Sequence, residues 1–390
     1  MVISFKMHVL FIFTFLYSMS LLNQHGFLTR ELTIPLWLRK KNIDVTFLTF
    51  GNKNDLNFSK LLNGINVIPV LDFINLKSKR LKFLKSLLIP IKFREQIKSI
   101  DIVRTDQLDE SSWIATIIKL LFRKKLIIRA GYEGLKSHIL GKAYSKMNSF
   151  KYWIHYLILY FNEFVSYKLA DRIILTNPFD IDFIINTFRL RNKKHKIKLI
   201  SNFVDTTHFR PLNIAKLDNH VLFIGRLSKV KNLVNLIKAF ADLKGFTLDI
   251  IGQGREKETL MNLAKEHKVD ANFLGVISHN ELPQILNQYR IAILPSYHEG
   301  NPKVLLEAMS CGIACIGTNV WGIKNIIDHN KTGILCETDS KSIKNAILTL
   351  NNDEPLMKEL GCNAREFILK NVSLNTIIRK ELSLYKSFSS

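Results

Sequence analysis

Short apolar runs alternate with longer amphipathic stretches along this chain, and this alternation limits the possible folds most strongly. HVLFIFTF precedes the helix-like LTRELTIPLWLRKKN and the strand-like IDVTFLTFG. Further strand candidates are INVIPVLDF, DIVRTD, KKLIIRAG, ADRIILTN and HKIKLISN. Strands interleaved with helices predict a parallel, doubly wound sheet. We therefore expect an α/β fold.

The alternation restarts after a polar stretch, NFVDTTHFRPLNIAKLDN, with VLFIGRL, the helix VKNLVNLIKAFADL and FTLDIIGQG. A chain of 390 residues exceeds the size at which one hydrophobic core keeps growing. We expect two Rossmann-like domains, residues 1–200 and 219–372, joined by a linker at 201–218, with a C-terminal helix at 373–390 that returns to the first domain. Ligands of such sheets bind beyond the carboxyl ends of the strands, so a cleft between the domains is expected.

Charge narrows the class of partner. Lys and Arg number 56 against 33 Asp and Glu, a formal charge of +23, which predicts attraction to nucleic acid, anionic lipid or nucleotide. Neither a zinc-finger nor an RNP-like signature is found, so nucleic acid is not the expected partner. The four cysteines form no C-x-x-C pair and no zinc-type spacing, which indicates reduced thiols in a cytosolic protein and no metal site.

The amino-terminal segment has two interpretations. Residues 7–29 contain no Asp, Glu, Lys or Arg, and HVLFIFTFLYSMSLL resembles a signal or anchor segment. Its densely apolar part is short and is followed by Thr and Ser, which also fits a buried parallel strand followed by a loop. The strand is favoured, and the membrane segment stays open.

The stretch HEGNPKVLLEAMSCG places two glutamates around a helix start. RIAILPS is the preceding strand, Asn301 is a suitable N-cap, and Pro302 suits the first turn. The helix start at Pro302, Lys303 and Val304 would attract an anion. Glu299 and Glu307 would then accept hydrogen bonds from sugar hydroxyls, although a capping Glu299 and a solvated Glu307 remain the alternative.

Two other segments are candidates for binding the same ligand, one through its charged side chains and one through a glycine turn. VLFIGRLSKVKN places Arg226 after a strand and Lys231 at the next helix start, where two cations could neutralise a pyrophosphate leaving group. LDIIGQGREKE places Gly252 and Gly254 in a turn that would let a ligand approach the backbone.

These segments resemble a known family. GRLSKVKN, IGQGREKETL, FLGVISHNEL, EGNPKVLLEAMSCG and GTNVWGIKNIIDHNKTGILC are similar to the nucleotide-sugar domain of GT-B glycosyltransferases, in the retaining family 4 group with its E-x7-E motif. The likeness runs from about residue 170 to 350. A GT-B sugar-nucleotide epimerase is the alternative within this fold.

The resemblance implies roles for matching residues. Arg226 and Lys231 would hold the donor diphosphate, Glu299 would contact the transferred sugar, and Glu307 would bind the ribose. The phosphate-facing turn would comprise Gly300, Asn301, Pro302 and Lys303, with Val304 beyond it, and Gly275 would lie by the base. The donor would be a UDP- or GDP-linked hexose, transferred with retention and without a metal or other cofactor.

A metal-dependent glycosyltransferase of the other main fold would need a D-x-D site. Asp180 and Asp182 have that spacing, but they follow a strand and begin a helix, where acids suit the helix dipole. We expect a helix start there.

The first domain departs from the family pattern. FLYSMSLLNQHGFLTRE has only Gly26 where the family carries a Gly-rich loop, and no H-x-H stretch follows the later strands. Asp106, Arg129 and Tyr132 stand at strand ends and are candidates for acceptor contacts. The acceptor, a glycan or a lipid-linked saccharide, stays undetermined, as does the oligomeric state.

Basic amphipathic stretches suggest a location. LKSKRLKFLKSLLIPIKFREQIK, at about residues 76–98, mixes cations with Leu, Phe and Ile, and KYWIHYLILYF adds aromatics. Such segments can lie on an anionic membrane surface, or can form solvated helices that cover the domain. We expect a cytoplasmic enzyme. Peripheral contact with the cytoplasmic face of a membrane is one of two possibilities, and solvated helices without such contact are the other. A nucleic-acid-binding protein and an inactive sugar-binding scaffold are the alternatives from other classes.

Overall fold

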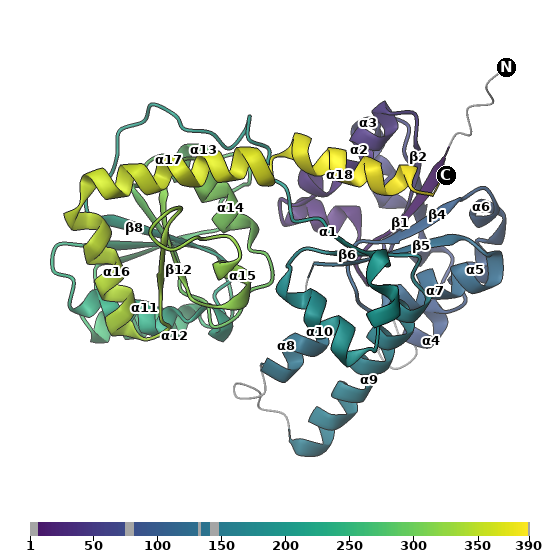
Figure 1. Cartoon of the computed structure of the whole chain (residues 1–390), viewed down its shortest axis with the longest axis horizontal. Helices are drawn as coiled ribbons and strands as arrows, with labels where there is room; N and C mark the ends of the chain where they lie inside the picture. Colours follow the sequence, from purple (N-terminus) through teal and green to yellow (C-terminus); the bar gives the residue numbers. More distant parts are fainter. Residues whose placement is uncertain (1–6, 75–81, 132–133, 141–147, 389–390) are drawn as a thin grey trace. The chain divides into compact units, whose positions relative to one another are not determined.

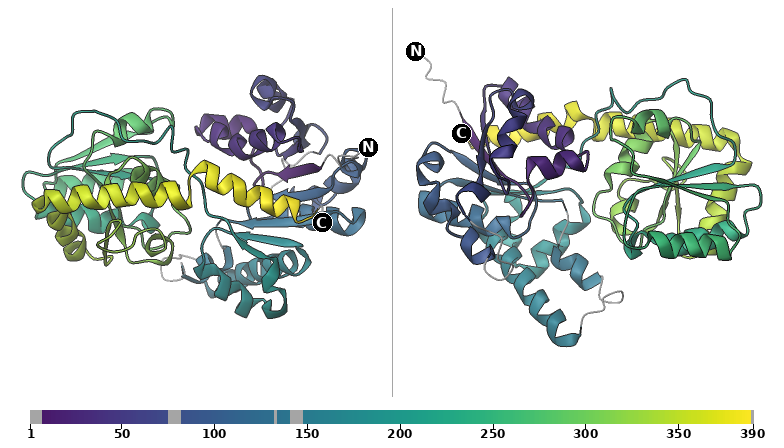
Figure 2. Two further views of the ribbon diagram at one scale, coloured as in Figure 1. Left: turned by 45° about the horizontal axis from the view of Figure 1, so that its top comes forward. Right: turned by 180° about the vertical axis from the view of Figure 1, so that it is seen from behind.

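The chain folds into two compact units. The computed structural model describes residues 7–74, 82–131, 134–140 and 148–388 (Figure 1). Residues Met1–Ile200 and Leu384–Ser390 form the first unit, and Ser201–Ser383 form the second. Each unit contains one parallel sheet with helices on both faces (Figure 2). The expected α/β class with two Rossmann-like domains is confirmed.

The sheet of the first unit has the strand order β3-β2-β1-β4-β5-β6-β7, and all its pairs are parallel. Its strands are β1 (His8–Ile12), β2 (Asp44–Thr49), β3 (Asn66–Pro69), β4 (Ile102–Thr105), β5 (Lys125–Ala130), β6 (Arg172–Leu175) and β7 (Ile197–Leu199). Each lies in a segment that the apolar runs predicted. The central strands are almost wholly buried, because helices cover both of their faces.

The helices of the first unit vary widely in length. They are α1 (Met19–Gln24), α2 (Leu28–Lys40), α3 (Ser59–Leu62), α4 (Lys82–Ser86), α5 (Ile89–Lys92), α6 (Arg94–Lys98), α7 (Ser111–Phe122), α8 (Gly134–Leu140), α9 (Ser149–Leu169) and α10 (Phe179–Thr187), with 3-10 turns η1 (Lys53–Phe58), η2 (Val70–Asp72) and η4 (Arg191–Lys196). The α10 helix carries Asp180 and Asp182 in its first turn, and Asp180 pairs with Lys136 at 2.5 Å. The helix start expected at the D-x-D spelling is confirmed.

The amino-terminal apolar segment forms strand β1, a loop and helix α1. Val9, Leu10 and Ile12 are fully buried in the sheet. Among the described residues, no helix has the length and apolar character needed to span a bilayer. The strand interpretation of this segment is therefore confirmed.

The sheet of the second unit has the order β10-β9-β8-β11-β12-β13, again with parallel pairs. Its strands are β8 (His220–Ile224), β9 (Thr247–Ile251), β10 (Ala271–Gly275), β11 (Ile291–Leu294), β12 (Ala314–Thr318) and β13 (Ile334–Cys336). Its helical segments are η5 (Lys229–Lys231), α11 (Leu233–Ala241), α12 (Lys257–Glu266), α13 (Leu282–Leu286), α14 (Lys303–Ser310), α15 (Trp321–Lys324), α16 (Ser340–Asn352) and α17 (Glu354–Asn371).

Two segments differ from simple connections between domains. The stretch expected as a linker, residues 201–218, belongs to the second unit, where Val204 and Phe209 are buried in the core. Helix α18 (Leu374–Lys386) crosses the division of the chain, because its residues from Leu384 onward belong to the first unit. There the Tyr385 hydroxyl accepts a 2.6 Å hydrogen bond from the buried Arg104 guanidinium.

Candidate functional site

The sequence-predicted donor residues follow two adjacent strands of the second unit. In the sheet order, β9 and β10 lie on one side of β8, and β11, β12 and β13 lie on the other. Chains leaving β8 and β11 therefore turn to opposite sides, which creates the switch point where such sheets bind ligands. Arg226 and Lys231 follow β8, whereas Glu299 follows β11.

The structure joins Lys231 and Glu299 directly. Lys231 Nζ lies 2.5 Å from Glu299 Oε1, and the two side chains are 19% and 11% exposed. The hydroxyl of Ser296 donates a 2.6 Å hydrogen bond to the same oxygen. The lysine stem runs over Gly225, where a Cβ would lie 3.7 Å from Lys231 Cε. A shielded ion pair with a further hydroxyl donor fixes both charges at the carboxyl edge of the sheet.

Hydrogen bonds between loops hold this pair in place. The Tyr297 amide donates to the carbonyl of Val230 at 2.8 Å, which links the loop after β11 to the turn that carries Lys231. Asn232, in the left-handed region at φ 55°, donates through its amide to the carbonyls of Pro295 at 3.0 Å and Thr338 at 2.8 Å. Sequence reasoning assigned no role to Asn232, although it closes the GRLSKVKN segment.

The helix after Glu299 starts later than expected. Helix α14 begins at Lys303, Pro302 occupies the N-cap position, and no side chain caps that end. Asn301 is not the cap, because its side-chain amide donates to Ser201 Oγ at 2.9 Å and its carbonyl accepts from Asn202 at 2.8 Å. Amides in the first turn of a helix have no partner within the helix, so this end suits an anion.

Glu307 lies one turn further along α14 and is buried, with 8% of its side chain exposed. Its Oε1 is 3.0 Å from Nε2 of His279, which stands in the loop after β10. The His279 ring packs edge-on against Phe209, with 5.1 Å between ring centroids. The alternative interpretation of Glu307 as a solvated helix residue is therefore wrong. Sequence reasoning also missed His279, although it lies within the family-like FLGVISHNEL.

Arg226 differs from the other charged residues of this edge. It is exposed, and within the described part of the chain no hydrogen bond or ion pair of its guanidinium is found. It is thus a free cation close in sequence to Lys231, on the same loop after β8. The structure places it at the edge of the sheet but does not join it to Glu299 or Glu307.

The two glycines after β9 were expected to let a ligand approach the backbone, but the structure gives another explanation for them. A Cβ on Gly252 would lie 1.9 Å from the carbonyl oxygen of Gly225, and one on Gly254 would lie 2.0 Å from that of Leu227. These glycines let the β9 loop pack on the β8 loop, so close approach of a ligand is not needed to explain them. Gly275 instead has φ 77° and open space around it.

Gly322, in α15, was not singled out from the sequence. A Cβ there would lie 2.3 Å from the carbonyl oxygen of Glu299 and 2.5 Å from that of Gly300. The absence of a side chain therefore lets α15 support the backbone of the loop that carries Glu299. The only signal in the sequence was the glycine within the family-like GTNVWGIKN.

In the first unit the corresponding switch point lies between β1 and β4, and Asp106 follows β4 there. Arg129, at the end of β5, donates through Nη1 to the carbonyl of Asp106 at 3.3 Å. The Asp106 amide donates to the carbonyl of Ile12, the last residue of β1, at 3.0 Å. Gly26 is exposed after α1 with φ 70°, and Tyr132 lies outside the described residues.

Two carboxylates fix the loop after β1 from either side. Asp55 is fully buried and accepts hydrogen bonds from the Thr49 hydroxyl at 2.6 Å and from the Ser20 amide at 3.2 Å. Asp109 accepts from the Phe15 amide at 2.7 Å and from the Ser111 hydroxyl at 2.5 Å. Burial raises the pKa of Asp109 to about 6, against the hydrogen bonds that favour its charged form.

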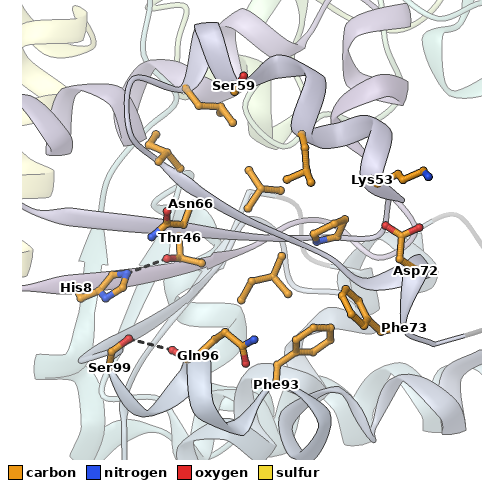
Figure 3. Close-up of a pocket in the computed structure, with 16 residues that line it drawn as sticks. His8, Thr46, Lys53, Ser59, Asn66, Asp72, Phe73, Phe93, Gln96 and Ser99 are labelled. Carbon is orange, nitrogen blue, oxygen red and sulfur yellow. Dashed lines mark hydrogen bonds between the residues drawn. The ribbon is translucent and has the colours of Figure 1, made fainter.

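A separate pocket of about 730 Å³ lies in the first unit (Figure 3). It follows the edge strand β3, and in Figure 3 the His8 ring bonds the Thr46 hydroxyl at one end while Lys53 and Asp72 lie at the other. Phe73 and Phe93 contribute aromatic surface to it. None of the candidate site residues lines this pocket, so the site is identified by its polar groups and not by its volume.

The geometry of the second unit supports one type of chemistry. An exposed cation, a partly buried ion pair and a helix end without a side-chain cap occur on loops of two neighbouring strands, and a second carboxylate follows on the helix. Cations and amides can bind phosphate oxygens, and the two carboxylates can accept hydrogen bonds from hydroxyls. Such a set suits a ligand that carries both phosphate and sugar.

Comparisons with known proteins agree with this chemistry. Residues 204–367 match the family model of glycosyl transferases group 1. The chain is 28% identical over 215 residues to N-acetyl-alpha-D-glucosaminyl L-malate synthase of Bacillus anthracis, covering 52% of this chain and 56% of that protein. This alignment thus spans about half of the relative's length.

Two comparisons extend over nearly the whole chain. The capsular polysaccharide biosynthesis glycosyltransferase CapM of Staphylococcus aureus is 24% identical over 379 residues, covering 90% of this chain and 92% of that protein. The structure of Anabaena HepE in complex with UDP and glucose superposes with a TM-score of 0.76 at 17% identity, covering 98% of this chain and 100% of that one. The likeness to this structure shows the same two-domain fold, and the family model matches residues 204–367, which lie in the second unit.

Proposed function

We propose that this protein is a retaining glycosyltransferase that moves a hexose-type sugar from a UDP- or GDP-linked donor to a glycan acceptor, without a metal ion. The observation that carries the proposal is the Lys231–Glu299 ion pair, held at 2.5 Å between the loops after β8 and β11. It stands just before the uncapped start of α14 in the chain. The presence of UDP and glucose in the similar HepE structure supports a nucleotide-sugar donor.

Arg226 and Lys231 bind the donor diphosphate in this proposal. The exposed Arg226 guanidinium offers several donors to phosphate oxygens, and the Lys231 ammonium can contact a phosphate while it stays beside Glu299. The start of α14, at Pro302, Lys303 and Val304, and the turn from Gly300 to Asn301 face the same phosphates. Negative charge develops on the diphosphate as it leaves, so these groups stabilise the transition state more than the bound donor.

The carboxylates recognise the two sugars. Glu299 accepts hydrogen bonds from hydroxyls of the transferred hexose, and Glu307 accepts from the ribose. Because His279 engages Oε1 of Glu307, the other oxygen is the one that faces the ribose. Gly275 lies on the side of the base, where its open surroundings leave room for a ring.

The transfer retains configuration when attack and departure use one face of the sugar. The bond between the anomeric carbon and the phosphate oxygen breaks, and the acceptor oxygen bonds to that carbon from the same side. The proton of the acceptor hydroxyl passes to the leaving phosphate oxygen. No protein nucleophile is required, which agrees with a site whose two carboxylates are each engaged by a partner.

The acceptor side belongs to the first unit in this proposal. Gly26, Asp106, Arg129 and Tyr132 are its candidate contacts. The relation to CapM supports synthesis of a cell-surface polysaccharide, a lipopolysaccharide or a glycolipid. A saccharide linked to lipid, handled at the cytoplasmic face of a membrane, is the acceptor class that we propose.

A panel of nucleotide sugars tests the donor assignment. A ligand at about 100 times its dissociation constant stabilises a protein by about 2.7 kcal/mol, so the melting temperature should rise with one UDP- or GDP-sugar. The same donor should then be consumed in the presence of EDTA, with the anomeric configuration of the product read by NMR. An inverted product would contradict retention, and loss of turnover in EDTA would contradict metal independence.

A further inference from the structure

Helix α9 exposes a continuous apolar stripe. Six residues spaced three or four apart on one helix face are each 43% to 75% exposed, which is unusual for side chains of this size. The residues of this stripe are Phe150, Trp153, Ile154, Leu157, Ile158 and Phe161. The opposite face, with Tyr152 and Tyr167, is buried against the first unit. Figure 1 shows α9 and α8 extending away from the sheet of this unit.

A basic segment adjoins the carboxyl end of α9, beyond the stripe. Residues 187–199 contain six Lys and Arg and no acid. Lys168, in the last turn of α9, donates to the carbonyl of Arg189 at 3.0 Å, and Lys193 donates to the carbonyl of Lys168 at 2.9 Å. The cations therefore cluster at the carboxyl end of α9, about two turns beyond Phe161, and Arg191 and Lys194 among them are exposed.

Among the described residues, no Lys or Arg of the segment 187–199 forms a salt bridge, and the nearby Asp171 is already paired with Lys119. Burial and then the charge of Lys193 lower the pKa of Lys196, so like charges are crowded here. The one acid of α9, Glu163, is buried and accepts a hydrogen bond from the Leu135 amide at 2.7 Å. An anionic surface would relieve this crowding.

We propose that the α9 stripe and the basic segment 187–199 form a docking surface for an anionic lipid bilayer. The stripe enters the boundary between headgroups and acyl chains, with Trp153 at the level where Trp side chains concentrate. The basic segment contacts lipid phosphates. This proposal concerns the first unit alone and does not depend on the donor assigned to the second.

A second copy of the chain is a less suitable occupant. Antiparallel pairing of two α9 stripes would bring the cationic carboxyl end of one helix to the amino end of the other, where Lys151 is exposed. Neither helix offers an exposed acid to balance these charges. A bilayer that carries anionic lipid supplies both the apolar layer and the opposite charge.

Vesicle sedimentation of the full-length protein tests the surface. We expect binding at physiological salt to vesicles of phosphatidylcholine with phosphatidylglycerol, and at least tenfold weaker binding to phosphatidylcholine alone. The Leu157→Ser/Ile158→Ser variant should lower partitioning about tenfold or more, because each side chain loses its transfer into lipid. The Arg191→Glu/Lys194→Glu variant should lose the preference for anionic lipid.

Matched variants separate this surface from the other basic amphipathic stretch. Leu84 and Leu88 are 58% and 55% exposed, close to the values in the stripe. The Leu84→Ser/Leu88→Ser variant should bind vesicles as the unaltered protein does. The Leu369→Ser variant, which alters an exposed residue of the second unit, should do the same. Loss of binding in the Leu84/Leu88 variant but not in the Leu157/Ile158 variant would overturn the proposal, as would the absence of vesicle binding.

Two further measurements keep the test independent of folding defects. Trp153→Phe should bind vesicles normally but lose most of the blue shift in tryptophan fluorescence that binding produces. In sedimentation velocity, the unaltered protein and the Leu157→Ser variant should show the same oligomeric state. A dimer that Leu157→Ser dissociates would assign the stripe to a second copy of the chain. An unchanged blue shift in Trp153→Phe would likewise contradict insertion of the stripe.

Discussion

The carboxyl edges of the two sheets are built in different ways. At the edge of the second unit, charged side chains from distant segments meet, as in the pairs Lys231–Glu299 and His279–Glu307. At the edge of the first unit, buried and half-buried carboxylates bind the backbone, as Asp109 does with the Phe15 amide. The second edge thus holds charges ready for a ligand, whereas the first uses its charges to hold a loop.

This difference explains why a sequence motif could be recognised for the edge of the second unit but not for that of the first. In the proposed function, the charges of the second edge contact a diphosphate and two sugars, which would restrict their type and spacing to a pattern such as E-x7-E. A loop held by carboxylates can be built in many ways, because any acid within reach of a backbone amide can serve. The absence of a Gly-rich loop after β1 therefore does not mean that the loop is loosely held.

The largest effect should come from the charged edge. Lys231→Ala or Arg226→Ala should lower kcat by about 10²-fold or more, the usual loss when one donor to a developing negative charge is removed. The control is Lys265→Ala, an exposed lysine on α12 with no ion pair among the described residues. Turnover should be measured with the donor found in the thermal panel. Normal turnover in both variants, with melting unchanged, would remove the proposed diphosphate site.

At the edge of the first unit, Asp109 should make the free energy of unfolding depend on pH. The pKa of Asp109 rises from 3.8 to about 6 on folding, so the folded state holds the proton more tightly. The stability that this proton gives is complete below about pH 4 and is lost as the pH rises through about 6. At 1.36 kcal/mol per pKa unit, the difference amounts to at most about 3 kcal/mol.

Urea unfolding of the unaltered protein and Asp109→Asn measures this loss as a difference between variants across pH 4 to 7. Tryptophan fluorescence reports mainly on the first unit, which contains Trp37, Trp113 and Trp153, against Trp321 in the second. Asp72→Asn, at an exposed carboxyl, is the control for the loss of a carboxylate from this unit. A flat difference for Asp109→Asn would contradict the raised pKa.

A smaller effect should follow from His279, a positioning residue for Glu307. His279→Ala should weaken binding of the free nucleotide about tenfold, because the Glu307 carboxylate loses the hydrogen bond that orients it. His279→Gln should restore most of the affinity, since its amide can donate at a similar reach. Calorimetric titration gives both values.

A double-variant cycle with Glu307→Gln decides whether the two residues act together. Coupled residues should give a combined loss smaller than the sum of the single losses. Additive losses would show that His279 supports the fold and not the carboxylate. His267→Ala, at the end of α12, serves as the control for a histidine outside the site.

The smallest effect is expected at the first edge. Arg129→Ala should raise the acceptor KM about three- to tenfold, the scale of one hydrogen bond, and should leave hydrolysis of the donor in the absence of acceptor unchanged. The control is Arg123→Ala, an exposed arginine after α7. A hundredfold loss of donor hydrolysis in Arg129→Ala would make the two edges alike and would break the comparison.

Much of the architecture was predictable because it depends on local pattern. Buried parallel strands read as apolar runs, and each expected strand of the first unit is found in the segment predicted for it. The positions of Arg226, Lys231, Glu299 and Glu307 after particular strands were predictable for the same reason. Helix starts were less so, since Asn301 looks like an N-cap in sequence but donates to Ser201 instead.

The sequence by itself determined the α/β class, the two parallel sheets and the segments that reach their carboxyl edges, because these follow from periodicities within about 15 residues. Only the tertiary structure decided that Lys231 meets Glu299 across 68 residues, that His279 meets Glu307, and that Gly252 makes room for Gly225. It also decided which apolar face of a helix stays exposed, as on α9. Periodicity defines a face, but burial depends on neighbours that are distant in the chain.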